Sequence, residues 1–493
     1  MSTSIPAEEF HALLGNSSGV PADYLSDVAW TKRTLERWLV DKAFRERFEE
    51  DPAGALRAIG SPLSPPQVLP FLGDEDDRAP GARPELPLSA RRYRAFLQEK
   101  LAHRAELRAH GQTTSDRRMA VWRARQMKRC VGELGASRSQ AIVHAPAAFE
   151  LSKGCTVGCW FCGVAAPKFD HTWPYSEQNA ALWDETLEVM RTTIGEPMRD
   201  AFLYWATDPL DNPDYEHFLT AFHDVFGQCP QTTTAIGQKD VERTRGLLEL
   251  ARARGSKVDR FSIIAVSALN RLHEAFSAEE LLHVECIPQN KGAAKSFRKS
   301  NSGRARKFAH KRGDEMVPEE ASSTIACVSG FLFNMVERSV QLITPCDASD
   351  RWPLGYWVLD QGTFDTGAEL GELVEGMIAR NMRTRLRLED PVRLRPDVAV
   401  TVADGELRAV SRGQRLALVQ GDLDDLAECL TQGVNSAEDL AVRRERRAGV
   451  PRVQTLSWLN SLFEEGLLDE EPEPPAVEPV PVALGMPTRA AAS

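Results

Sequence analysis

Three cysteines, Cys155, Cys159 and Cys162, lie close together in the stretch ELSKGCTVGCWFCGVAAPKF, residues 150–169. This C-x3-C-x2-C group holds a third of the nine cysteines of the chain. In a reducing compartment, clustered thiols indicate metal or redox chemistry, whereas scattered thiols are usually buried and inert. The remaining six are scattered: Cys130, Cys229, Cys286, Cys327, Cys346 and Cys429.

The spacing favours iron over zinc. A structural zinc site needs four ligands, and no fourth Cys or His falls at a suitable offset nearby, His171 being the one close candidate. A [4Fe–4S] cluster usually takes four thiolates, so three thiolates leave one iron open for a non-protein ligand. A closed zinc site with a distant fourth ligand is the alternative.

The composition describes an ordinary globular protein. The chain has 493 residues, which suggests two to four domains, with 42% apolar and 27% charged residues. Its formal charge of −11 argues against non-specific binding to nucleic acid or to an acidic membrane surface. We see neither a signal peptide nor a membrane span in the sequence, and we expect a cytoplasmic protein.

From about residue 146, short β-rich runs alternate with longer helical ones. The β-rich runs are AFELS, DAFLYWA, TTTAIG, FSIIAVSAL and HVECIP. Strands separated by ten- to fifteen-residue helices predict βα units and a parallel sheet, open or curled into a barrel. Active sites of such sheets lie at the carboxyl ends of the strands. The cysteine group begins three residues after the first run, on that edge.

The flanking regions have different patterns. Apolar residues at helical spacing precede a Pro-rich stretch, and VAVTVADGELRAV alternates around Asp404-Gly405, which predicts a hairpin. Helical stretches near 422–442 and 452–466 follow, and a hairpin packed on helices suggests a winged-helix-like module. The expected organisation is: 1–60, N-terminal helical region; 61–89, Pro-rich linker; 90–145, helical lead-in; 146–365, barrel; 366–387, connecting helix; 388–471, winged-helix-like domain; 472–493, disordered tail.

A basic insertion interrupts the barrel region at residues 292–313, GAAKSFRKSNSGRARKFAHKRG. We expect a mobile surface loop, and a clamp for a negatively charged substrate segment is the alternative.

The stretch CTVGCWFC resembles the signature of the radical SAM superfamily, with Phe161 at the usual aromatic position. The resemblance implies an α/β fold with a partial (β/α)6 barrel over residues 146–365. It also implies a [4Fe–4S] cluster whose open iron binds S-adenosyl-L-methionine, together with an electron donor such as flavodoxin or ferredoxin. In YWATDPLDNPDY, Asp208 stands where the superfamily has a Gly-Gly-Glu-like turn that holds the amino group of the cofactor. We expect three further residues to face the cofactor at later strand ends: Gln238, Ser267 and Gln289.

Residues 326–360, and ITPCDASDRWPLGY above all, resemble the radical SAM peptide epimerases that mature ribosomally made natural products of the proteusin type. That family converts L-residues to D-residues in a precursor peptide, and a cysteine thiol returns the hydrogen atom. We expect Cys346 to be this donor at the mouth of the barrel, because it follows the apolar run QLIT, with Cys327 as the fallback. A peptide cross-linking radical SAM enzyme and a DNA-binding regulator are the alternatives.

The segment from PVRLRPDVAV to FEEGLLDE resembles the winged-helix recognition elements that bind leader peptides of such precursors. This resemblance implies a precursor peptide, leader plus core, as the partner, held by strand addition to an exposed β-edge. The acidic stretches DLDDLAE and FEEGLLDEE count against binding to DNA.

Overall fold

The computed structural model describes residues 10–15, 17–72, 86–110, 113–294, 300–312, 324–418 and 422–474. The predictions for residues 1–9, for the centre of the Pro-rich linker, for part of the basic insertion and for the tail from residue 475 lie outside these ranges. In the described part, no helix combines the length and the apolar character that a membrane crossing requires.

Short capped helices form the N-terminal part of the described chain. The Asp41 side chain accepts hydrogen bonds from the first turn of the second helix, and Asp51 does the same for the third. Phe44 and Phe48 lie in the small core that these helices share. The helices are α1 (Ala22–Val40), α2 (Lys42–Glu50), α3 (Pro52–Ala58) and α4 (Pro65–Val68), the last continuing into a 3-10 turn at Leu69–Phe71.

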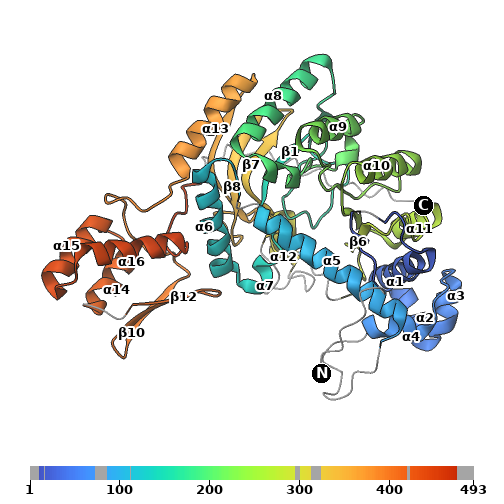
Figure 1. Ribbon diagram of the computed structural model, residues 1–493, viewed down its shortest axis with the longest axis horizontal. Helices are drawn as coiled ribbons and strands as arrows, with labels where there is room; N and C mark the ends of the chain where they lie inside the picture. Colours follow the sequence, from blue (N-terminus) through green and yellow to red (C-terminus); the bar gives the residue numbers. More distant parts are fainter. Residues whose placement is uncertain are drawn as a thin grey trace.

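The helical lead-in connects the two ends of the molecule (Figure 1). It comprises α5 (Leu88–His110), α6 (Arg117–Leu134) and α7 (Ala136–Ser139). Arg123 of α6 is fully buried and donates to the carbonyl groups of His144 and Ser329, next to two strand starts. A guanidinium group has several fixed donors, so one buried arginine can satisfy carbonyls that no strand pairs. Helix α6 is therefore fastened to the amino-terminal edge of the sheet.

The predicted βα units are present. Strand β1 (Ala145–Glu150) has one parallel bridge to Phe202, and β4 (Thr233–Thr234), β5 (Asp259–Ile263) and β6 (Val284–Pro288) pair in parallel. The helices that follow these strands lie in succession around the outside of the strands (Figure 1). They are α8 (Glu177–Thr193), α9 (Tyr215–Phe226), α10 (Val241–Ala253) and α11 (Val266–Ala275).

Three later strands extend the sheet on the other side of β1. Strand β7 (Val328–Asn334) pairs in parallel with β1, and β8 (Ser339–Pro345) and β9 (Tyr356–Thr363) then add in antiparallel fashion. The run QLIT lies in β8, so it ends at the opposite edge from the carboxyl ends of the parallel strands. The main core packs between this sheet and the helices, with α13 (Gly367–Asn381) covering one side. The molecule is thus a mixed α/β protein.

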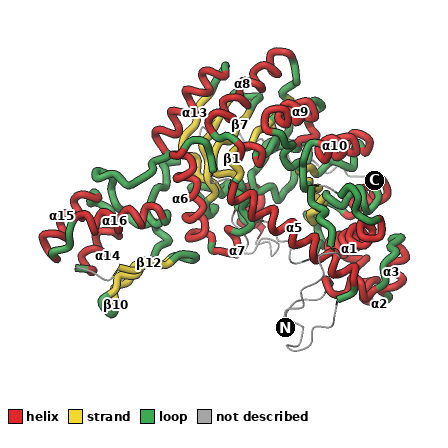
Figure 2. The backbone as a smooth tube through the Cα atoms, viewed as in Figure 1, coloured by secondary structure: helices red, strands yellow, loops and turns green. Residues whose placement is uncertain are grey.

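The C-terminal part has its own core of aliphatic and aromatic side chains. The Asp404-Gly405 turn has positive φ angles of 54° and 75°, as a two-residue hairpin turn requires, so the hairpin prediction is confirmed. Gly433, at φ 69°, divides the first of the two expected helical stretches. The elements are β10 (Ala399–Ala403), β11 (Glu406–Val410), β12 (Arg415–Leu418), α14 (Leu423–Gln432), α15 (Ala437–Ala448) and α16 (Arg452–Glu464). Figure 2 shows this sheet and these helices apart from the other strands.

Candidate functional site

The three clustered cysteines lie on one loop at the carboxyl end of β1. Strand β2 (Ser152–Lys153) pairs with β3 (His171–Thr172), and Cys155 forms a bridge with Lys168, so residues 155–168 form the loop of a hairpin. Gly154 makes this turn at φ 78°, and a Cβ there would lie 2.3 Å from the Lys168 carbonyl oxygen. The predicted position of the cysteines at a strand end is therefore observed.

The three thiols are free, and those of Cys155 and Cys162 are close enough to influence Cys159 electrostatically. Burial, and then the neighbouring thiols of Cys162 and Cys155, raise the pKa of Cys159 to about 11. The Ala166 amide donates to the Cys162 sulfur at 3.2 Å and the Val157 amide to the Cys155 sulfur at 3.4 Å. A bound cation would relieve the mutual repulsion of three thiolates, and amide donors to sulfur are typical around thiolate ligands.

The spacing of the sulfur atoms argues against a single zinc ion. A tetrahedral Zn–S site with bonds of about 2.3 Å brings its sulfurs to roughly 3.8 Å from one another. The three sulfurs of this loop do not all lie within 4.8 Å of one another. His171, the nearest predicted fourth ligand, is 57% exposed and its imidazole lies beside Asp170. A polynuclear cluster, which binds each thiolate at a different metal atom, fits the wider spacing.

The end of the basic insertion holds the cysteine loop through hydrogen bonds and a ring contact. Residues 303–312, at its end, form helix α12 (Gly303–Arg312), so the expectation of a loop is wrong for this part. Arg304 Nη1 donates to the Cys159 carbonyl at 2.5 Å, Nη2 donates to the Ala166 carbonyl, and its amide donates to the Cys162 carbonyl at 2.9 Å. Phe308 contacts Trp160, with ring centroids 5.1 Å apart, and Trp160 meets Phe161 edge-on.

Asp208, the residue expected to hold the amino group of the cofactor, lies near Cys155 of this loop. Burial, and then the charges of Asp208 and Asp211, raise the pKa of Cys155 to about 11. The Asp208 carboxylate already accepts hydrogen bonds from Thr234 Oγ1 and from the Ala235 amide, both at 2.7 Å. It is 4% exposed, and burial raises its pKa to about 6. The structure therefore gives Asp208 partners within the protein that hold two strand ends together.

Glu150 is a buried carboxylate that sequence reasoning missed. It ends β1 and accepts from the Ala206 amide at 2.7 Å and from Asn334 Nδ2 at 3.0 Å. Burial raises its pKa to about 7. The available signal was an acidic residue at the end of an apolar strand, immediately before the cysteine loop.

A cavity of about 450 Å³ opens on the face of the sheet opposite the main core. Val164 of the cysteine loop, Tyr204, Arg260 and Cys327 line it, so it reaches from the loop to the start of β7. Glu285 lies on its wall, and although burial opposes ionisation, Lys100 and Arg260 lower the pKa of Glu285 to about 2. The cavity therefore combines a mostly apolar wall with an ion-paired carboxylate.

The structure brings only one of the three later strand-end residues to this cavity. Gln289 lines it, and its amide donates to Ile263 at the end of β5. Gln238 lies in a turn after β4, and Ser267 is exposed in the first turn of α11, so neither lines this cavity. Ser262, inside β5, lines the cavity, whereas we had expected Ser267 to do so.

Cys346 lies elsewhere than predicted. Strand β8 runs antiparallel to the parallel strands, so its carboxyl end lies at their amino edge rather than at the mouth. The Cys346 side chain is buried against Trp352 and Trp357, near Arg129 and Glu133 of α6, on the helix-covered face of the sheet. Cys327, the fallback thiol, also lies at the amino edge, just before β7, but unlike Cys346 it lines the cavity, as Cys229 does.

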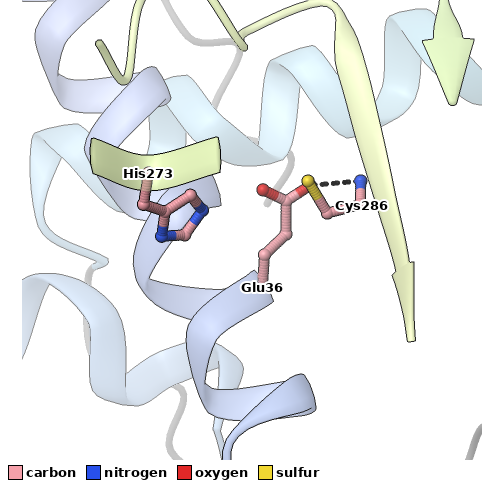
Figure 3. A group of neighbouring side chains, drawn as sticks. All are labelled: Glu36, His273 and Cys286. Carbon is pink, nitrogen blue, oxygen red and sulfur yellow. Dashed lines mark hydrogen bonds between the residues drawn. The ribbon is translucent and has the colours of Figure 1, made fainter. Parts of the chain in front are cut away.

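A second group of potential ligands joins the N-terminal helices to the sheet. Glu36 of α1, His273 of α11 and Cys286 of β6 point toward one another (Figure 3), with ligand atoms within 4.8 Å. Glu36 Oε1 accepts from the Cys286 amide at 2.9 Å, an edge-strand N–H that no strand pairs, and from Lys32 at 2.8 Å. Burial and the charges of Arg33, Arg37 and Lys32 lower the pKa of His273 well below its usual range. Three cationic side chains this close disfavour the binding of a metal ion, so we infer that this cluster has a structural role.

Comparisons with known proteins give one close relative. No family model matches the chain. A structure of BtrN in complex with AdoMet and 2-DOIA is 13% identical and covers 40% of this chain and 72% of that one, with a TM-score of 0.27, too low to support an argument. The uncharacterized protein y4wI of Sinorhizobium fredii (strain NBRC 101917 / NGR234) is 37% identical over 453 residues, which span 89% of this chain and 87% of y4wI. The chain therefore belongs to the same protein family as y4wI.

Proposed function

We propose that this protein is a radical SAM enzyme with one [4Fe–4S] cluster bound by Cys155, Cys159 and Cys162. The observation that carries the proposal is the C-x3-C-x2-C loop, held at the carboxyl end of β1 with sulfurs too widely spaced for one zinc ion. When bound, the cluster and S-adenosyl-L-methionine supply a carbon radical that abstracts hydrogen. The protein contributes the three thiolates, the amides that support two of them and a cavity that begins at Val164.

Anaerobic reconstitution with iron and sulfide tests this proposal. We expect about four irons per chain, together with reductive cleavage of S-adenosyl-L-methionine when dithionite is the electron source. The matched controls are Cys155→Ala and Cys429→Ala, because Cys429 is buried in the separate C-terminal core. Loss of iron in the first variant and retention in the second support the assignment. Equal retention in both would refute it.

We further propose that the substrate is a ribosomal precursor peptide whose leader binds the C-terminal part. A groove lies between Leu418, at the end of the edge strand β12, and the α16 residues Val453 and Trp458. Val453 is 71% exposed, and Trp458 Nε1 is buried without a hydrogen-bond partner in the described chain. An edge strand beside an apolar groove suits a peptide that adds as a further strand.

The reaction we propose is inversion of an L-residue to a D-residue at Cα. Removal of the Cα hydrogen leaves a planar radical, and a thiol on the far side can return a hydrogen atom through its weak S–H bond. Cys229 and Cys327 both line the cavity, and Cys327 is the less buried of the two, so we assign the donor role to it rather than to the buried Cys346. The sulfur radical that remains on Cys327 then takes one electron from the electron donor and one proton from solvent.

Turnover in D2O with a precursor peptide from the same gene neighbourhood tests the reaction class. Epimerisation predicts one deuterium gained per inverted residue, with the peptide otherwise unchanged. A loss of two hydrogens would instead identify a cross-linking enzyme. Val453→Asp should weaken leader binding at least tenfold in fluorescence anisotropy, whereas Val434→Asp, at an equally exposed position outside the groove, should not.

A further inference from the structure

Helix α12 is held between two parts of the fold. On one side Arg304 and Phe308 contact the cysteine loop. On the other, the Gly303 amide donates to the Pro353 carbonyl at 2.7 Å, and Arg306 pairs with Asp350 at 3.1 Å. The segment that follows Cys346 thus contacts α12 in addition to the cysteine loop. These contacts make α12 a fixed part of the surface beside the thiols.

The outer side of α12 is basic. Lys307, His310 and Lys311 are exposed, and at about 100° per residue Lys307 and Lys311 form a row beside the one formed by Arg304 and Phe308. Neither lysine pairs with a carboxylate in the described part of the chain. The exposed ammonium groups therefore lie next to the side of the helix that contacts Cys159 and Cys162.

This basic surface contrasts with the rest of the protein. The formal charge of the chain is −11, whereas residues 291–312 contain no aspartate or glutamate. An acidic protein would be repelled by most of this molecule and attracted to α12, because complementary charge steers encounter and like charge suppresses it. Interfaces between redox partners are small and transient, so one short helix beside a cluster provides a large enough docking surface.

We propose that the exposed side of α12, around Lys307 and Lys311, docks an acidic one-electron carrier protein of the flavodoxin type. The inference rests on the proposed function, because the electron needs a cluster in the adjacent loop as its destination. Electron transfer weakens steeply with distance, and Arg304 and Phe308 of the same helix contact the loop that carries the thiols directly.

Charge reversal tests the docking surface. The variant is Lys307→Glu with Lys311→Glu, and the matched control, Lys42→Glu with Arg57→Glu, makes the same charge change on the exposed N-terminal helices. Titration calorimetry with oxidised bacterial flavodoxin at low ionic strength should show at least tenfold weaker binding for the α12 variant only. The flavodoxin concentration that half-saturates S-adenosyl-L-methionine cleavage should rise by the same factor.

Dithionite separates this inference from the proposed function. Dithionite-driven cleavage and iron content should stay within twofold of the wild type in both variants. Absence of dithionite-driven cleavage in the wild type would refute the enzyme itself. Normal flavodoxin binding by the α12 variant, or no binding by the wild type, would overturn the docking surface. The docking surface would also be overturned if the α12 variant lost dithionite-driven peptide modification by the same factor, because this result would identify α12 as a substrate clamp.

The acidic residues of the chain itself are the competing occupants of this surface. They are Asp314, Glu315, Glu319 and Glu320, which follow the helix in the sequence. If changing them to serine creates flavodoxin binding that the wild type lacks, the chain covers its own lysines and the proposal is wrong.

Discussion

Arg304 joins helix α12 to the cysteine loop by donating to the Cys159 carbonyl oxygen at 2.5 Å. The same guanidinium group also donates to the Ala166 carbonyl, so one side chain spans the loop on both sides of Cys162. The ladder that closes the loop is short, with two β2–β3 residue pairs and the Cys155–Lys168 bridge, and Thr156 donates to the Asp211 carboxylate. The position of the thiols therefore depends on a helix more than a hundred residues away in the sequence.

Arg304→Ala should lower the iron content of the reconstituted protein to less than half that of the wild type. Hydrogen bonds from a charged donor contribute about 1.5–3 kcal/mol each, and this change removes two of them from the loop. Iron analysis with circular dichroism measures the effect. Lys307→Ala, one turn further along the exposed side, is the control and should retain full iron. Equal iron in both variants would show that α12 does not hold the loop.

Gly303→Ala should destabilise the protein by more than about 2 kcal/mol, because positive φ and a backbone clash act together. Gly303 has φ 56°, and an added Cβ would lie 2.2 Å from the Gly163 carbonyl oxygen. Gly246→Ala, inside helix α10 with open space around it, should instead stabilise by about 0.5–1 kcal/mol. Chemical denaturation followed by circular dichroism compares the two. A tolerated Gly303→Ala would contradict the close approach of α12 to the loop.

Glu150 should make the stability of the folded protein fall as pH rises. Burial raises its folded pKa to about 7 from 4.5, so the folded state binds more protons than the unfolded state between these values. Relative to the wild type, Glu150→Gln should therefore gain stability from pH 4.5 to 7, by at most about 3 kcal/mol. Denaturation at several pH values measures this difference. A pH-independent difference for Glu150→Gln would place this carboxylate in water.

Cys327→Ala should abolish deuterium incorporation into the peptide while S-adenosyl-L-methionine cleavage continues, because the radical forms but receives no hydrogen atom. Cys346→Ala should retain incorporation, since its thiol lies against α6 on the other face of the sheet. Mass spectrometry of the peptide and quantification of 5′-deoxyadenosine measure both outcomes. Incorporation lost only in Cys346→Ala would restore the prediction made from the sequence.

Local patterns in the sequence predicted local structure correctly. The alternation of strands and helices, the Asp404-Gly405 turn and the place of the cysteine loop after β1 were all visible as short-range signals. The pairing of β7 with β1 was not, because the partners Ala145 and Val328 are far apart in the chain and no local pattern encodes their register. Because β7 is parallel to β1 and β8 is antiparallel to β7, Cys346 lies at the amino edge of the parallel strands and not at their carboxyl edge, where we expected it.

Helix α12 was missed for a related reason. Its charged composition indicated a solvated loop, whereas the two residues that fix it, Arg304 and Phe308, are ordinary until their contacts with the loop are known. Glu150 was missed because an acidic residue at a strand end is usually a solvated terminus. Its burial arises from Ala206 and Asn334, which come from other strand ends.

Iron analysis combined with electron paramagnetic resonance of the anaerobically reduced protein tests the central claim most directly. Three thiolates on the 155–168 loop predict about four irons per chain and a signal that changes when S-adenosyl-L-methionine is added. The triple replacement of Cys155, Cys159 and Cys162 by alanine should remove both. One zinc ion and no iron per wild-type chain, or an unchanged cluster in the triple variant, would contradict the account.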